Sequence, residues 1–158
     1  MALQTSVVTA APVAVPGMAA TPDQSVYTPL NYLADATNGV HVGRFAWFDS
    51  DGNLSNTQVA STLPVGLVER VINYPILDVT SSASDLVPAT MPVTCAVKGD
   101  YWVVTATAAT VGQAVFAMTD GTVKTDASGA TVTGGIETSW RVKTAGSAND
   151  VILISNWA

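Results

Sequence analysis

The sequence predicts an all-β protein, an antiparallel sandwich or barrel of jelly-roll-like character with an extended N-terminal arm. Three observations support this class. From residue 39 onward, short runs rich in valine, threonine and aromatic residues alternate with turn residues, and no window has a helical period. The first 38 residues are proline-containing and nearly uncharged. Two segments of the β region also resemble each other.

The predicted arm comprises residues 1–38, whose only charged side chains are Asp23 and Asp35. Its prolines fix φ and bias the preceding residues toward extended backbone, so a helix is disfavoured. The segment is either a disordered tail or an arm that lies on a neighbouring subunit. Disordered segments usually combine low hydrophobicity with high charge, and this segment lacks the charge. The arm is therefore the favoured interpretation.

The predicted β domain comprises residues 39–158 and is punctuated by turns. Asp51-Gly52 and Asp120-Gly121 stand between apolar runs, which is a strong short-range signal for a hairpin. Residues 73–92 read as a connection that contains proline and serine. We expect strands over residues 45–48, 65–72, 93–97, 101–105, 114–118, 140–143 and 151–154.

An internal repeat spans about residues 42–70 and 111–138. Val-Gly and Asp-Gly frame a strand in both copies, with the glycines at positions 43 and 52 and again at 112 and 121. Downstream, residues 65–69 match residues 133–137 in the same order. Chance similarity between two hairpins is the alternative to duplication. A duplicated hairpin is a scaffold feature and places no reactive group.

The charge and composition exclude several classes of partner. The chain has 158 residues, which suits one domain, or one domain plus an arm. Its six cations are spread singly and its net charge is −6, so we expect no nucleic-acid partner. No run is long and apolar enough for a transmembrane helix, so we expect no membrane partner. Charged residues make up 11%, against about 25% in ordinary proteins, which indicates surface hidden against partners.

No catalytic, cofactor-binding or metal-binding residues are expected. A Ser/His/Asp or Cys/His site would have to use His41, the single histidine, for which a structural or surface role is the favoured interpretation. A zinc site is not expected, because there is no second histidine and Cys95 is the single cysteine. Asp49 and Asp51 resemble the start of a calcium loop, but the twelfth position is Ala60 instead of glutamate. A turn is the better interpretation of that stretch. Only a spatial pair of carboxylates, as in a small hydrolase, is left open.

Five short motifs resemble the structural cement, or capsid decoration, proteins of tailed-phage heads. They lie at residues 43–49, 65–70, 98–104, 109–117 and 154–157, and their order and spacing carry the resemblance over residues 39–158. The resemblance implies a β-rich virion protein that binds the outer capsid surface as an oligomer. It would bridge neighbouring subunits of the major capsid protein and thereby stabilise the shell. The family offers no catalytic residues to carry over.

The expected contact residues are apolar or aromatic and lie mainly in the arm. They are Val13, Val15, Pro16, Tyr27, Tyr32 and Trp157. For the homo-oligomer, a trimer is favoured over a dimer. A carbohydrate-binding or adhesin module on a virion surface is the alternative function, because four tryptophans could supply a sugar-binding platform.

Overall fold

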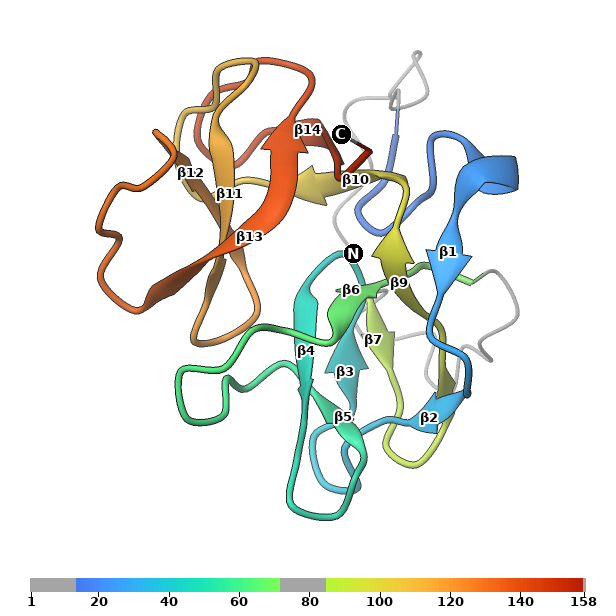
Figure 1. The fold of residues 1–158 in the computed structure, drawn as a ribbon. Helices are drawn as coiled ribbons and strands as arrows, with labels where there is room; N and C mark the ends of the chain where they lie inside the picture. The colour runs from blue at the N-terminus through green and yellow to red at the C-terminus, as the bar shows by residue number, and fades with distance from the viewer. Residues whose placement is uncertain (1–13, 72–84, 158) are drawn as a thin grey trace, which may run out of the picture.

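The structure is a computed structural model, and it describes residues 14–71 and 85–157 (Figure 1). Two five-stranded antiparallel sheets and two two-stranded ladders make up the described part, with one short 3-10 helix, η1 (Pro22–Gln24). The two large sheets pack face to face, as in a sandwich, and neither closes into a barrel. The predicted all-β antiparallel class is confirmed, and the sandwich describes it better than the barrel.

The first sheet has the strand order β1-β9-β6-β4-β5. Its strands are β1 (Val26–Tyr27), β9 (Cys95–Lys98), β6 (Gly66–Val68), β4 (Phe45–Phe48) and β5 (Leu54–Ser55).

The second sheet has the order β10-β14-β13-β11-β12. Its strands are β10 (Asp100–Val104), β14 (Val151–Ser155), β13 (Gly135–Val142), β11 (Ala114–Met118) and β12 (Val123–Asp126).

The first sheet is buried on both faces, which explains why β4 is apolar without interruption. Phe45 and Trp47 point into the core between the two sheets, whereas Ala46 points into a second core. That second core is covered by the ladders β2 (Tyr32–Leu33) with β8 (Pro92–Val93) and β3 (Val40–His41) with β7 (Leu86–Val87). The first sheet is therefore the middle layer of the molecule.

Residues 14–38, the described part of the predicted arm, run along the sheets of their own chain. Gly17 N–H donates to Trp102 O at 2.7 Å, and Trp102 N–H donates to Met18 O at 3.0 Å, so this stretch extends the edge of β10. Further along, β1 pairs with β9 and β2 pairs with β8. Its described residues contribute backbone pairs to the β domain of the same chain, and they also include η1 and several turns. Residues 1–13 of the arm lie outside the described residues.

Several predicted strands differ in length from the observed ones. Of the predicted strand 65–72, the described residues 65–71 form a strand only over β6, and of the predicted strand 140–143, residues 140–142 are the end of the longer β13. The predicted strand 93–97 is divided between β8 and β9. Within the connection predicted at 73–92, residues 85–92 include β7, and residues 72–84 lie outside the described part.

The two Val-Gly…Asp-Gly blocks each form a hairpin, β4–β5 and β11–β12. All four framing glycines have positive φ; Gly43 is at 71° and Gly112 at 90°. The strands that follow pair differently, because Phe45 lies opposite Leu67 whereas Ala114 lies opposite Arg141. The two hairpins thus have the same local conformation, but the strands that follow them pair in different registers. The duplication stays a prediction.

Candidate interaction surface

The side chains that the sequence offers for catalysis are dispersed. The His41 ring pairs with Asp85 at 3.1 Å, and both side chains are more than a third exposed. Cys95 is fully buried, and burial raises the pKa of its thiol to about 12, so the thiol stays protonated at neutral pH. In residues 14–71 and 85–157, no three His, Cys, Asp or Glu side chains gather closely enough to hold a metal ion.

Asp49 begins the turn of the β4–β5 hairpin. Its Oδ1 accepts hydrogen bonds from the backbone N–H groups of Asp51 and Asn53, both at 2.8 Å. A carboxylate that accepts from backbone two and four residues ahead stabilises a tight turn. The predicted turn is confirmed at this position.

The predicted contact residues do not form one patch. Val13 lies outside the described residues, Val15 is exposed, and Pro16 packs beside Gly43 and lines a cavity of about 240 Å³. Tyr32 packs edge-on against Phe48, with ring centroids 4.7 Å apart, next to the β4–β5 hairpin.

Tyr27 belongs to β1, and Trp157 lies beside the end of β9. The Tyr27 hydroxyl donates to the half-buried carboxylate of Glu69 at 3.3 Å. Burial raises the pKa of Glu69, because desolvation disfavours the charged carboxylate, and the Tyr27 hydrogen bond opposes this effect. Tyr27 therefore ties the edge strand β1 to the end of β6.

The C-terminal residues are fastened at the bend between β9 and β10. The Asn156 side chain donates to Val97 O at 2.6 Å and accepts from Gly99 N–H at 2.9 Å. Beyond it, the Trp157 ring lies 5.7 Å from the Lys98 ammonium, in cation–π geometry. These contacts present Trp157, which is 39% exposed, next to β1.

A shallow groove of about 170 Å³ lies where the two sheets meet, and we call it the inter-sheet groove. Phe45 and Trp140 line it and are buried, whereas Leu63 is 68% exposed and Val97 39% exposed. No charged side chain lines the groove. An uncharged apolar hollow with exposed apolar residues at its margin is typical of a surface that binds another polypeptide.

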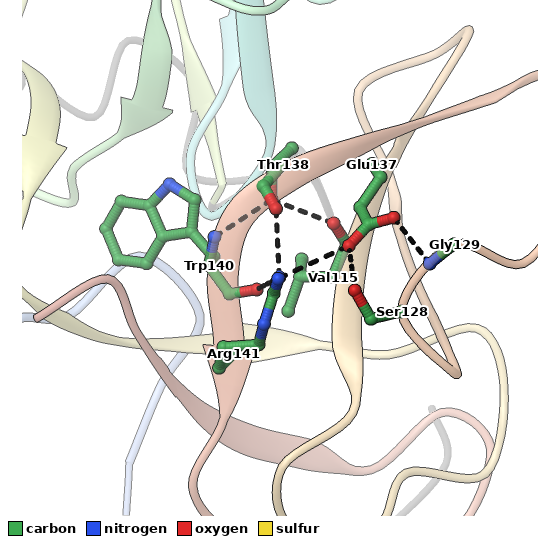
Figure 2. A network of polar contacts seen from close by, with 7 residues as sticks. All are labelled: Val115, Ser128, Gly129, Glu137, Thr138, Trp140 and Arg141. Atoms are coloured by element: carbon green, nitrogen blue, oxygen red, sulfur yellow. Dashed lines mark hydrogen bonds and ion pairs between the residues drawn. The ribbon is translucent and has the colours of Figure 1, made fainter. Parts of the chain in front are cut away.

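A bulge in β13 positions Trp140, which lines this groove. Figure 2 shows the polar contacts around the bulge. Residues 138–140 lie opposite the single residue Val115, because the β11–β13 register shifts there. The Thr138 hydroxyl donates to Val115 O at 2.8 Å and accepts from Trp140 N–H at 3.3 Å. The bulge turns the indole inward, where it packs edge-on against Phe45 and Tyr101.

Arg141 and Glu137 complete the network around the bulge (Figure 2). The Arg141 guanidinium donates to the carbonyls of Thr138 and Trp140 at 3.0 and 2.9 Å, and its other nitrogen lies 3.3 Å from Glu137 Oε1. Glu137 also accepts from Ser128 and from the Gly129 N–H, and these bonds lower its pKa. Arg141 thus supplies hydrogen bonds to the carbonyls of two of the three bulged residues.

The sequence interpretation did not identify Leu63 and Val97 as contact residues. Val97 sits inside a predicted strand, where an apolar residue is normally assigned to the core. Leu63 stands outside every predicted strand, just before Pro64, so no sheet face accounts for its apolar side chain. An apolar residue outside every predicted strand is the signal that could have identified Leu63 as a contact residue. The convergence of both residues on Trp140 depends on strand pairing that the sequence does not display.

Comparison with known proteins identifies a phage capsid family. The family model of the XM1 gp53 minor capsid protein matches residues 3–156. A chain of a solved structure described as "The capsid of Myoviridae Phage XM1" shares the fold, with a TM-score of 0.65 and 18% identity over 99% of this chain and 98% of that chain. No curated protein matches.

These findings define the class of protein as a structural component of a phage capsid, associated with the capsid shell in the virion. The chain belongs to the XM1 gp53 minor capsid protein family. The resemblance to phage-head structural proteins, on the motifs quoted above, is confirmed at the level of a capsid-associated family. Within the described residues, no helix is of a length and hydropathy that would let it cross a bilayer.

Proposed function

We propose that this protein is a capsid cement protein, which binds the outer surface of the phage head and bridges neighbouring subunits of the major capsid protein. The observation that carries the proposal is the uncharged inter-sheet groove, margined by exposed Leu63 and Val97, in a member of a minor capsid protein family. A structural protein of this kind needs complementary surface and no reactive group.

The low charge of the chain suits this role. Burying an ionised side chain in an interface costs free energy unless it finds a partner, and charged residues are only 11% of this sequence. Each apolar contact contributes about 25 cal/mol per Å² before the costs of association. Many identical contacts around one shell then act together, because each bound copy raises the effective concentration of the next contact.

The predicted contacts extend this surface. Tyr27 and Trp157 are exposed beside β9, the strand that also supplies Val97 to the inter-sheet groove. We propose that these side chains, with Val13, Val15, Pro16 and Tyr32, contact the capsid or a neighbouring copy. As the quaternary state we propose a homo-oligomer, with a trimer favoured over a dimer.

Binding to undecorated heads tests the cement function. Purified protein is mixed with heads that lack it, and co-sedimentation and thermal release of DNA are measured. We expect saturable binding that raises the temperature of DNA release. Leu63→Lys should weaken binding by at least about tenfold, because an unpaired ammonium would enter the groove. Val111→Lys is the matched control, since Val111 is 66% exposed in the turn before β11.

Absence of co-sedimentation by the parent protein would contradict the cement function. Equal binding by Leu63→Lys and Val111→Lys would instead remove the inter-sheet groove from the contact surface. Electron microscopy of decorated heads would then locate the surface that faces the shell.

The carbohydrate-binding alternative finds no support in the placement of the tryptophans. Trp47 and Trp140 are buried, and Trp102 is partly buried. Trp157 alone is exposed, and its ring is already engaged by Lys98. A sugar-binding platform needs an open aromatic face, so a glycan array is expected to show no binding.

A further inference from the structure

The two buried tryptophans of the core differ at their indole nitrogens. Trp47 is 1% exposed, and its indole N–H donates to Thr62 O at 2.8 Å. Trp140 is 3% exposed, and its indole N–H has no hydrogen-bond partner among the described residues. In Figure 2 no dashed line reaches the indole nitrogen, because the contacts around the bulge engage only the backbone of Trp140. A buried tryptophan normally finds an acceptor for its N–H, so this open donor needs a reason.

The Trp140 indole nitrogen reaches the surface at the inter-sheet groove. Within the described part of the chain, the buried side-chain polar atoms without a partner are Ser25 Oγ and Tyr101 Oη, so the Trp140 nitrogen is not enclosed in the core. The rings of Phe45 and Tyr101 pack edge-on against the indole, and the inter-sheet groove is the hollow that Trp140 lines. The groove therefore offers a hydrogen-bond donor beside apolar side chains.

The chain that presents Leu63 at the groove is held in place by Trp47. The Trp47 indole binds Thr62 O, and the N–H and hydroxyl of Thr62 both donate to Val59 O, at 3.1 and 2.7 Å. These bonds fix the backbone immediately before Leu63, whose side chain is left exposed. An apolar side chain on a fixed backbone loses little conformational freedom on binding, so this part of the groove is preorganised for a partner.

The chemistry of the groove selects a neutral polypeptide as its ligand. An open N–H requires an acceptor, and the described lining residues include no charged side chain, so a carboxylate or phosphate would lose its hydration without meeting a cation. A backbone carbonyl is a neutral acceptor, and the same chain can supply an apolar side chain to Leu63 and Val97. An apolar cavity of about 150 Å³ holds one benzene molecule. The groove, of about 170 Å³, therefore suits one side chain of similar size.

We propose that the inter-sheet groove binds an uncharged, apolar segment of the major capsid protein. One side chain of that segment fills the hollow, and a neighbouring backbone carbonyl accepts a hydrogen bond from the Trp140 indole N–H. The inference rests on the proposed cement function, which supplies the partner, and it adds the chemistry of the segment that is bound. Trp140 is then a contact residue although its ring is almost wholly buried.

Removing the indole N–H tests the hydrogen bond. Dissociation constants for undecorated heads are measured by co-sedimentation, with circular dichroism as the check on folding. Trp140→Phe should bind about tenfold more weakly than the parent protein, because the carbonyl of the bound segment loses its donor. Trp102→Phe is the matched control, since Trp102 is a partly buried tryptophan of β10 that does not line the groove, and it should bind like the parent protein. Equal binding by Trp140→Phe and the parent protein, or an equal loss in both variants, would overturn the proposal.

A measurement on the unaltered protein tests the open donor without any substitution. Hydrogen exchange at the indole nitrogens is followed by nuclear magnetic resonance on free protein that carries isotope-labelled tryptophan. We expect the Trp140 indole proton to exchange rapidly with solvent and the Trp47 indole proton to exchange slowly, because Trp47 is bonded to Thr62. Slow exchange at both nitrogens would overturn the proposal.

Cross-linking identifies the segment in the groove. A diazirine-bearing analogue of leucine replaces Leu63, and the same analogue at Val111, an exposed position outside the groove, is the control. On decorated heads, position 63 should cross-link to a stretch of the major capsid protein that has no charged side chain, and position 111 should not cross-link to that stretch. A cross-link from position 63 to a second copy of this chain or to a charged segment, or no cross-link, would overturn the inference and leave the cement function standing. A parent protein that does not sediment with heads would overturn both.

Discussion

The Thr138 hydroxyl organises the β13 bulge, and replacing it with valine tests that account. Valine has nearly the same shape as threonine, so Thr138→Val should preserve packing at this buried site and remove only the hydroxyl. The change leaves Val115 O and Trp140 N–H without their partner. An unsatisfied buried group costs about 1–3 kcal/mol, and the longer Trp140 bond contributes less, so we expect a loss of about 2–4 kcal/mol.

Thermal unfolding followed by circular dichroism measures this loss. For a chain of this size, 1 kcal/mol corresponds to about 2–4 °C, so Tm should fall by roughly 5–15 °C. Thr138→Ser keeps the hydroxyl and should retain most of the stability, and Ser139→Ala, at the exposed neighbouring position, should be nearly neutral. A Tm for Thr138→Val no lower than that of Thr138→Ser would refute the role of the hydroxyl in the bulge.

Two further predictions concern buried ionisable groups. Burial raises the pKa of Glu69 from its usual value of 4.5, so the folded state favours the protonated carboxyl. Protonation of Glu69 therefore stabilises the folded state fully below pH 4.5, and this stabilisation is lost as pH rises through the raised pKa. Glu69→Gln should therefore be more stable than the parent protein at neutral pH and should flatten the pH dependence of Tm; a Tm at neutral pH below that of the parent would contradict this. The Cys95 thiol, buried with a pKa of about 12, should resist a thiol-specific reagent at pH 8 in the folded protein and react fully in guanidinium, and rapid labelling of the folded protein would show that this core opens.

Local patterns determined the class of the fold and the turns. The Asp-Gly pairs, the valine- and threonine-rich runs and the absence of a helical period are properties of neighbouring residues, and each predicts backbone conformation directly. Asp49 forms its turn because the carboxylate and the N–H groups it accepts from lie within four residues. Trp47 and Cys95, which lie inside predicted strands, are buried.

The contact surface could not be derived in the same way. Leu63, Val97 and Trp140 are far apart in the chain and meet at one groove only because two sheets pack against each other. The register of β13 is equally non-local, because the Thr138 bulge is defined by its opposite strand, β11. A match between residues 65–69 and 133–137 therefore did not predict which residues pair.

The sequence by itself determined an all-β chain that is poor in charged residues and has a proline-containing N-terminal segment, because those properties depend on composition and on local backbone preference. The tertiary structure decided that residues 17–28 pair first with β10 and then with β9 of their own chain. Strand pairing is the reason, since it satisfies backbone groups between segments as distant in the chain as Gly17 and Trp102, and no local pattern specifies the partner.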